Sequence, residues 1–235
     1  MNHEIPYRIF PSGDASITLD FGNTINETIN KEVIAKFKQL QIHPLPFMIE
    51  AVPAYSSLTV YYNVVAIKKK ITGGLTAFEW IRQQLEERWQ QPVPDQVTTT
   101  RLVNIPVCYE KEFALDAEKL TRIKNISIDE MIRIHSASSY RVYMLGFLPG
   151  FAYMGEVDEK IAMPRKKQPQ PIEAGSVGIA GRQTGIYPMA SPGGWQIIGR
   201  TPLQLFDPER EEPTLLKAGD TVRFYSISKD EFNNY

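Results

Sequence analysis

Apolar and polar positions in the first part of the chain switch between the period of a strand and that of a helix. Strict alternation at 15–21 predicts a half-buried strand. Apolar residues then recur at helical spacing over 24–40, which predicts an amphipathic helix that ends before Pro44. Two more strands are predicted at 47–52 and 57–62, so this region should form a small sheet with a helix packed on it.

A second helix is predicted to begin at Thr76, because Thr76 and Glu79 have the spacing of a capping box. Its apolar face consists of Phe78, Ile81, Leu85 and Trp89. A strand at 100–107 follows. The predicted order is strand, helix, strand, strand, helix, strand, which fits a ferredoxin-like layer with helices on one face of a sheet.

The composition changes after 90–96, a segment with two prolines and few apolar residues that reads as a linker. Two short helices are predicted next, one around 116–123 and one that begins at Ser127, where Ser127 and Glu130 have the spacing of a second capping box. Ten of the 15 glycines then fall between Gly146 and Gly199. That density of glycine and proline excludes a helix and predicts short strands joined by tight turns, as in a β-sandwich or β-barrel.

We therefore expect an α+β chain with a ferredoxin-like domain at 1–95 and a β domain at 96–235. The formal net charge of -1 argues against a dedicated nucleic-acid-binding protein. The single cysteine, Cys108, suits a reducing compartment. There is no apolar run of membrane-spanning length and no signal-peptide pattern, so we expect a cytoplasmic protein without a membrane partner.

Several common catalytic motifs are absent from the sequence. There is no P-loop, no dinucleotide-binding glycine fingerprint and no nucleophile elbow. The only histidines are His3, His43 and His135, so no bound metal is expected. Cys108 could act as a nucleophile with His135 as its base, but a lone cysteine in a strand is more often a small core residue.

The segment 146–154 is the first candidate site. Pro149-Gly150 favours a type II turn, since proline presets its own φ and glycine accepts a positive φ. The turn would display Phe147 and Phe151 around one bend, next to Tyr153. These rings could be a hairpin corner packed into the core or the wall of a ligand or partner groove.

Basic and neutral polar side chains form the second candidate. Residues 165–167 are most simply a solvated basic loop, whereas Arg182, Gln183 and Thr184 stand between two glycines that would let a ligand approach closely. A guanidinium matches a carboxylate or phosphate, and the other two side chains add neutral hydrogen bonds. The alternative is a hairpin whose arginine merely covers a sheet edge.

Three further residues are weighed against structural roles. Trp195, after two glycines, could place its indole at a rim or plug the core. Arg200 follows at a strand end, where it could face a ligand. His135 lies on a helix close in sequence to the glycine-rich block, although a single histidine on a helix is more often structural than catalytic.

Two long segments carry a family resemblance: HSASSYRVYMLGFLPGFAYMGEVD, followed by MPRKKQPQPIEAGSVGIAGRQTGIYPMASPGGWQIIGRTPLQLFDP. Together with PAYSSLTVYYN they closely resemble the family called allophanate hydrolase subunit 1. The family includes the KipI inhibitors of sporulation histidine kinases and the PxpB-type component of bacterial ATP-dependent 5-oxoprolinase. The resemblance implies a cyclophilin-like β-barrel for the second domain and a subunit 2-type partner (PxpC or KipA).

The resemblance also implies an activity: with PxpA-type and PxpC-type subunits, the chain would use ATP to open 5-oxoproline to glutamate. A lactam is a poor electrophile, so its oxygen must be phosphorylated before water attacks, and the site needs cations for phosphate and carboxylate. We assign catalytic roles to Arg182, Arg200 and His135. Substrate-binding roles are assigned to Gln183, Thr184, Tyr187, Trp195, Phe147 and Phe151. ATP could bind at a site shared with the partner.

Two alternative functions follow from the same family. One is inhibition of a sensor histidine kinase, with the aromatic corner from Phe147 to Tyr153 as the docking surface. The other is half of a carboxyltransferase or allophanate hydrolase-type complex. That activity needs a biotin carrier, and no carrier lysine motif is visible, so no biotin is expected in this chain.

Overall fold

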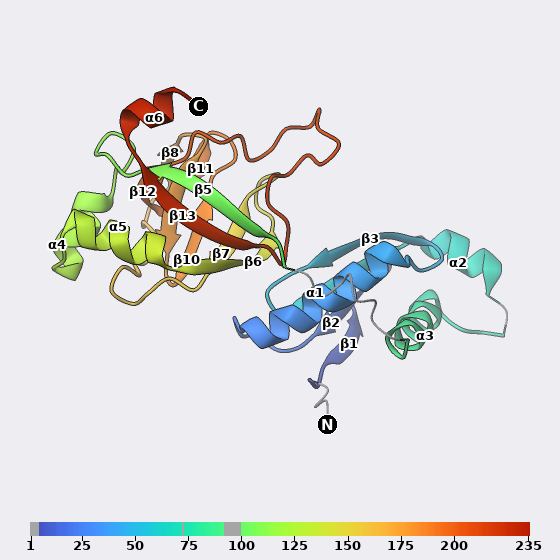
Figure 1. Ribbon diagram of the computed structural model, residues 1–235. Coiled ribbons are helices and arrows are strands. Elements are labelled where there is room, and N and C mark those ends of the chain that lie inside the picture. The colour runs from blue at the N-terminus through green and yellow to red at the C-terminus, as the bar shows by residue number, and fades with distance from the viewer. Residues whose placement is uncertain (1–4, 72, 92–99) are drawn as a thin grey trace. The chain divides into compact units, whose positions relative to one another are not determined.

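The computed structural model describes residues 5–71, 73–91 and 100–235 (Figure 1). The chain forms two compact units that divide between residues 99 and 100. The boundary predicted between residues 95 and 96 lies outside the described residues. The fold mixes helices and strands, as expected, and each unit has its own apolar core.

The N-terminal unit is a four-stranded antiparallel sheet with helices. Its described elements are β1 (Arg8–Pro11), β2 (Ser16–Asp20), α1 (Glu27–Ile42), β3 (Met48–Pro53), β4 (Ser57–Tyr62), α2 (Val64–Lys70) and α3 (Ala77–Trp89). The strands lie in the order β1-β2-β4-β3. Ile17 of β2 pairs with Val60 of β4, and alternate residues of both strands form one core with Val33 of α1 and Ile81 of α3.

The predicted elements of this unit are present within a few residues of their expected bounds. The capping box at Thr76 is confirmed, because the Glu79 carboxylate accepts from the Thr76 backbone N–H at 2.8 Å and the Thr76 hydroxyl accepts from the Glu79 N–H at 3.1 Å. Two elements were not predicted, the short strand β1 and helix α2. The signal for α2 was Asn63, whose side chain caps it by accepting the Ala66 N–H.

The strand predicted at 100–107 does not join this sheet, so the predicted ferredoxin-like order is not confirmed. Strand β5 (Leu102–Cys108) instead pairs in parallel with β13 (Thr221–Ile227) in the other unit. The place beside β2 is taken by β1, with Arg8 opposite Asp20. A short turn closes this β1–β2 hairpin. The loss of chain entropy on pairing is therefore smaller than it would be for β2 and a strand about eighty residues further along.

The C-terminal unit is a closed β-barrel, which confirms the barrel alternative (Figure 1). The barrel order is β10-β7-β6-β13-β5-β12-β9, and β8 and β11 form a separate two-stranded sheet. The remaining elements are α4 (Ala117–Lys124), α5 (Ile128–Ala137), β6 (Ser139–Leu145), β7 (Ala152–Gly155), β8 (Gln170–Ile172), β9 (Ser176–Ala180), β10 (Gln183–Ile186), β11 (Ser191–Gly193), β12 (Gln196–Arg200) and α6 (Lys229–Asn233). The finer assignment to a cyclophilin-like barrel stays a prediction.

Alternation along the barrel strands separates two apolar clusters. Ala152 and Met154 of β7 point into the barrel and belong to its main core. Tyr153, between them, points to the outer side and packs on a second cluster that contains Phe151 and Trp195. This second cluster brings together the aromatic residues that the sequence singled out.

Candidate functional site

His135 of α5 lies inside the barrel with none of its surface exposed. Its Nδ1 is 2.8 Å from the Tyr109 hydroxyl, and its Nε2 is 3.1 Å from the Thr184 hydroxyl. The Thr184 hydroxyl donates to the carbonyl oxygen of Gly178 at 3.1 Å, so it must accept from the imidazole Nε2–H. Nδ1 therefore accepts a hydrogen bond from the Tyr109 O–H, and these contacts hold the imidazole in one neutral tautomer.

Burial also decides the charge of His135. Loss of water lowers the pKa of the imidazole from an ordinary value of 6.5 to about 3. The ring stacks on Phe224 with 4.5 Å between the ring centroids. The imidazole is therefore neutral near pH 7, has both nitrogens hydrogen-bonded and has no surface open to a ligand. His135 and Thr184 therefore lie in the barrel core, away from the exposed residues of the candidate site, and the catalytic and substrate-binding roles assigned to them stay predictions.

The two arginines assigned to catalysis lie at opposite ends of β9. Arg200 is paired with Ser176, the first residue of β9. Arg182 lies in the turn just beyond Ala180, the last residue of the same strand. The ends of a strand of this length are about 13 Å apart at 3.3 Å per residue. The strand register therefore places the two arginines at opposite ends of β9, and the catalytic roles assigned to them stay predictions.

Both of these guanidinium groups are also already engaged. Arg182 Nη2 is 2.6 Å from a carboxylate oxygen of Glu156, and its Nε is 3.6 Å from Glu159. Arg200 Nε donates to the carbonyl oxygen of Ala174 at 2.7 Å. A guanidinium has five N–H donors, so these contacts use only part of the hydrogen-bonding capacity of each arginine.

Five aromatic side chains meet on the outer side of the barrel and form what we call the aromatic face. They are Phe147, Phe151, Tyr153, Tyr187 and Trp195. The rings meet mostly edge to face, with centroid distances from 4.8 Å for Phe151–Tyr153 to 6.5 Å for Phe147–Tyr187. Edge-to-face geometry is favourable and holds each ring in one orientation.

The aromatic face has a buried floor and an exposed edge. Its floor is formed by Phe151, Tyr187 and Trp195, which are at most 4% exposed and so pack as a small core. Phe147 is 60% exposed and Tyr153 is half-buried. Phe147 has a φ of 72°, which is uncommon for a bulky residue and is typical of functional sites. Gln183 is half-buried in β10, opposite Gly155 and Ala180.

The expected turn at Pro149-Gly150 explains how the chain reaches this face. Gly150 has a φ of 82°, the value that a type II turn requires at its third position. A Cβ there would also lie 2.9 Å from the Phe206 Cβ, so only glycine fits. The turn brings Phe147 and Phe151 onto the same side of the barrel, 5.6 Å apart between ring centroids.

The basic segment 165–167 was predicted to be a solvated loop, and for Lys166 this prediction is wrong. Its ammonium forms a 2.6 Å ion pair with Asp116, and the two side chains are only 7% and 13% exposed. The same Asp116 carboxylate accepts the Ile197 N–H at 2.7 Å. No sequence spacing could indicate this pair, because Asp116 lies fifty residues earlier in the chain.

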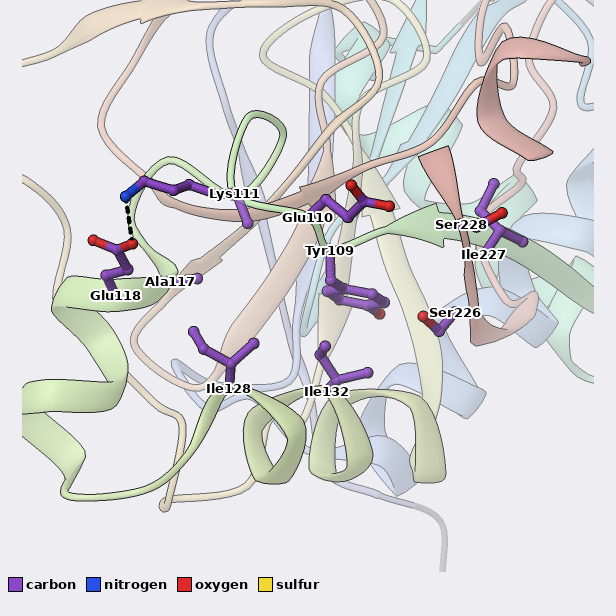
Figure 2. A pocket seen from close by; sticks show the side chains of 11 residues that line it. Tyr109, Glu110, Lys111, Ala117, Glu118, Ile128, Ile132, Ser226, Ile227 and Ser228 are labelled. Carbon is purple, nitrogen blue, oxygen red and sulfur yellow. Dashed lines mark ion pairs between the residues drawn. The ribbon is translucent and has the colours of Figure 1, made fainter. Parts of the chain in front are cut away.

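A pocket of about 540 Å³ lies elsewhere in the barrel unit, between α4, α5 and the ends of β5 and β13 (Figure 2). Its lining residues are Tyr109, Glu110, Lys111, Ala114, Ala117, Glu118, Ile128, Ile132, Ser226, Ile227 and Ser228. None of the predicted site residues is among them. Its one lysine, Lys111, is 2.9 Å from the Glu118 carboxylate, so the pocket offers little to an anionic ligand.

Within residues 5–71, 73–91 and 100–235, no three His, Cys, Asp or Glu side chains are grouped as metal ligands. None of the helices in these ranges has the length and apolar character needed to cross a bilayer.

Known structures share this fold. The crystal structure of TTHA0988 matches with a TM-score of 0.77 and 33% identity, covering 91% of this chain. This chain spans only 40% of that longer chain. The crystal structure of the conserved uncharacterized protein PH0987 from Pyrococcus horikoshii matches with a TM-score of 0.55 and 40% identity, covering 96% of this chain and all of that one.

Sequence comparisons extend over nearly the whole chain. The B component of 5-oxoprolinase from Bacillus subtilis (strain 168) is 45% identical over 98% of this chain and 97% of its own length. The protein of the same name from Escherichia coli O157:H7 is 34% identical over 92% and 94%. Residues 7–216 match the family model described as carboxyltransferase domain, subdomain C and D. The chain therefore belongs to this carboxyltransferase-domain family together with the B components of 5-oxoprolinase, which confirms the resemblance read from its sequence.

Proposed function

We propose that this chain is the B component of an ATP-dependent 5-oxoprolinase that opens the lactam of 5-oxoproline to glutamate. The observation that carries the proposal is the 45% identity to a 5-oxoprolinase B component over 98% of this chain. The likeness covers both units, so it is not restricted to a shared barrel.

The chain would act as one part of a complex with PxpA-type and PxpC-type subunits. In TTHA0988 the matching region is 40% of a longer chain, which supports the idea that this fold works beside a further polypeptide. The reaction needs ATP to activate the lactam oxygen. Arg182 is held by two glutamates, so we assign the triphosphate mainly to the partner subunits. We place the complex in the cytoplasm, where a free thiol such as Cys108 stays reduced.

Reconstitution tests this proposal. The chain is purified alone and with its PxpA-type and PxpC-type partners, and glutamate release from 5-oxoproline is measured with and without ATP. We expect release only when all three subunits and ATP are present. Full activity from the two partners without this chain would contradict the proposal.

The exposed ring of Phe147 favours a second candidate function, docking to a sensor histidine kinase. Adding the chain to such a kinase should then lower autophosphorylation, and a Phe147→Ala variant should lower it less. Unchanged autophosphorylation at a large excess of the chain would remove this candidate.

A further inference from the structure

Arg165 lies in a segment whose backbone is held on both sides. The carbonyl oxygen of Pro164 accepts from Gln196 Nε2 at 2.8 Å. The backbone N–H of Lys166 donates to the carbonyl oxygen of Gly194 at 2.7 Å. The buried ion pair of Lys166 adds a third attachment. Arg165 is therefore fixed at its Cα by its neighbours, while its own side chain remains exposed.

The guanidinium of Arg165 has no acidic partner among the described residues. No carboxylate oxygen in that part of the chain lies within 4.0 Å of it, whereas Arg182 has two glutamates. The side chain runs past Gly194, since a Cβ built on that glycine would lie 3.8 Å from Arg165 Nε. The glycine leaves room for the guanidinium and for a ligand beside it.

Arg165 lies next to the aromatic face. Burial raises the pKa of the Tyr153 phenol and of the Tyr187 phenol, and in both cases the positive charge of Arg165 opposes the rise. The Trp195 backbone N–H also hydrogen-bonds to Tyr187 and lowers its pKa. The geometry agrees: Arg165 Nε lies 3.8 Å from the Cβ position of Gly194, and Gly194 directly precedes Trp195 of this face.

We propose that Arg165 binds the carboxylate of the substrate at the aromatic face, with the substrate ring packed against Phe147 and Tyr153. This inference rests on the proposed function. A guanidinium offers two parallel N–H donors that match a carboxylate, and an aromatic edge suits the apolar carbons of a five-membered ring. The neighbouring ammonium of Lys166 is already paired with Asp116 and adds no free positive charge. The single charge of Arg165 therefore suits a singly charged anion better than a triphosphate.

The test uses the reconstituted complex with an Arg165→Ala variant and a matched Lys167→Ala variant. Lys167 is also exposed, and its replacement by alanine removes the same charge. Lys167 does not contribute to the pKa shift of the Tyr153 or Tyr187 phenol. Losing a charge-assisted hydrogen bond should raise KM for 5-oxoproline by about 10- to 100-fold. KM for ATP should change by less than about twofold in both variants. Arg165→Lys should recover only part of the loss, because an ammonium lacks the two-pronged geometry.

Several outcomes would overturn the inference. One is the same KM for 5-oxoproline in Arg165→Ala and Lys167→Ala. Another is a rise in KM for ATP alone, which would make the site a phosphate site. Circular dichroism and complex assembly should be the same for Arg165→Ala and Lys167→Ala. If Arg165→Ala differs, the Arg165→Lys variant is measured instead. A wild-type KM for 5-oxoproline in Arg165→Lys would then contradict the proposal. A wild-type complex without activity would instead refute the proposed function.

Discussion

The buried state of His135 makes the stability of the barrel depend on pH in a specific way. In the folded protein its pKa is about 3, whereas an exposed imidazole has an ordinary value of 6.5. The unfolded chain therefore takes up a proton first as the pH falls. Stability is lost from about pH 6.5 downwards and the loss ends near pH 3, with a slope of about 1.4 kcal/mol per pH unit between them.

The size of this effect can be measured with His135→Gln, which cannot titrate but keeps an amide donor and acceptor. Between pH 7 and pH 5 the wild-type chain should lose about 2 kcal/mol more free energy of unfolding than the variant. Urea unfolding is followed by the fluorescence of Trp195 in a Trp80→Phe/Trp89→Phe background, so that the signal reports on the barrel unit alone. Any pH dependence from carboxyl groups is common to both chains and cancels.

His43→Gln is the matched control, because His43 is exposed in the other unit. It should show the same pH dependence of barrel unfolding as the wild-type chain. If wild type and His135→Gln lose equal stability between pH 7 and pH 5, the imidazole is not buried in a neutral state. His135 would then return to the candidate site as a group able to exchange protons.

Two other contacts give measurable stability changes. Lys166→Met should destabilise the barrel by about 3 kcal/mol in urea unfolding, because it leaves a buried Asp116 carboxylate without its cation. The double variant with Asp116→Asn should lose less than the two single variants together, and strict additivity would show that the pair is not coupled. Gly193→Ala should cost about 1–3 kcal/mol, since its Cβ would lie 2.6 Å from Tyr187 Cζ. Gly194→Ala is the control, with its nearest neighbour at 3.7 Å, and an equal loss in both variants would contradict the packing argument.

Local features of the structure could be predicted from short stretches of sequence. Thr76 and Ser127 each cap a helix by accepting the backbone N–H of the residue three positions later. At Ser127 only this half of the predicted capping box forms, because the Glu130 carboxylate binds Arg133. Glycine and proline between Gly146 and Gly199 exclude long helices and leave short strands. The long sequence motifs in that region also identified the family, because their order of residues is specific to it.

The predictions that the structure does not confirm depend on which distant segments pair. Strand β5 was expected in the first sheet, and only its pairing with β13 places it in the barrel. Arg182 and Arg200 are close enough in sequence to suggest one site, yet the register of β9 with its two neighbours puts them at opposite ends. Strand register is a non-local property, so hydrophobic pattern alone did not reveal it.

By itself, the sequence of this protein determined the capped helices, the glycine-rich barrel strands and the family. Each of these depends on residues a few positions apart. Only the tertiary structure decided that His135 is a buried neutral residue, that Lys166 is paired with Asp116, and that Arg165, among the described residues, is left without an acidic partner beside the aromatic face. Burial and pairing depend on what the rest of the chain places around a side chain, and that environment comes from residues distant in the sequence.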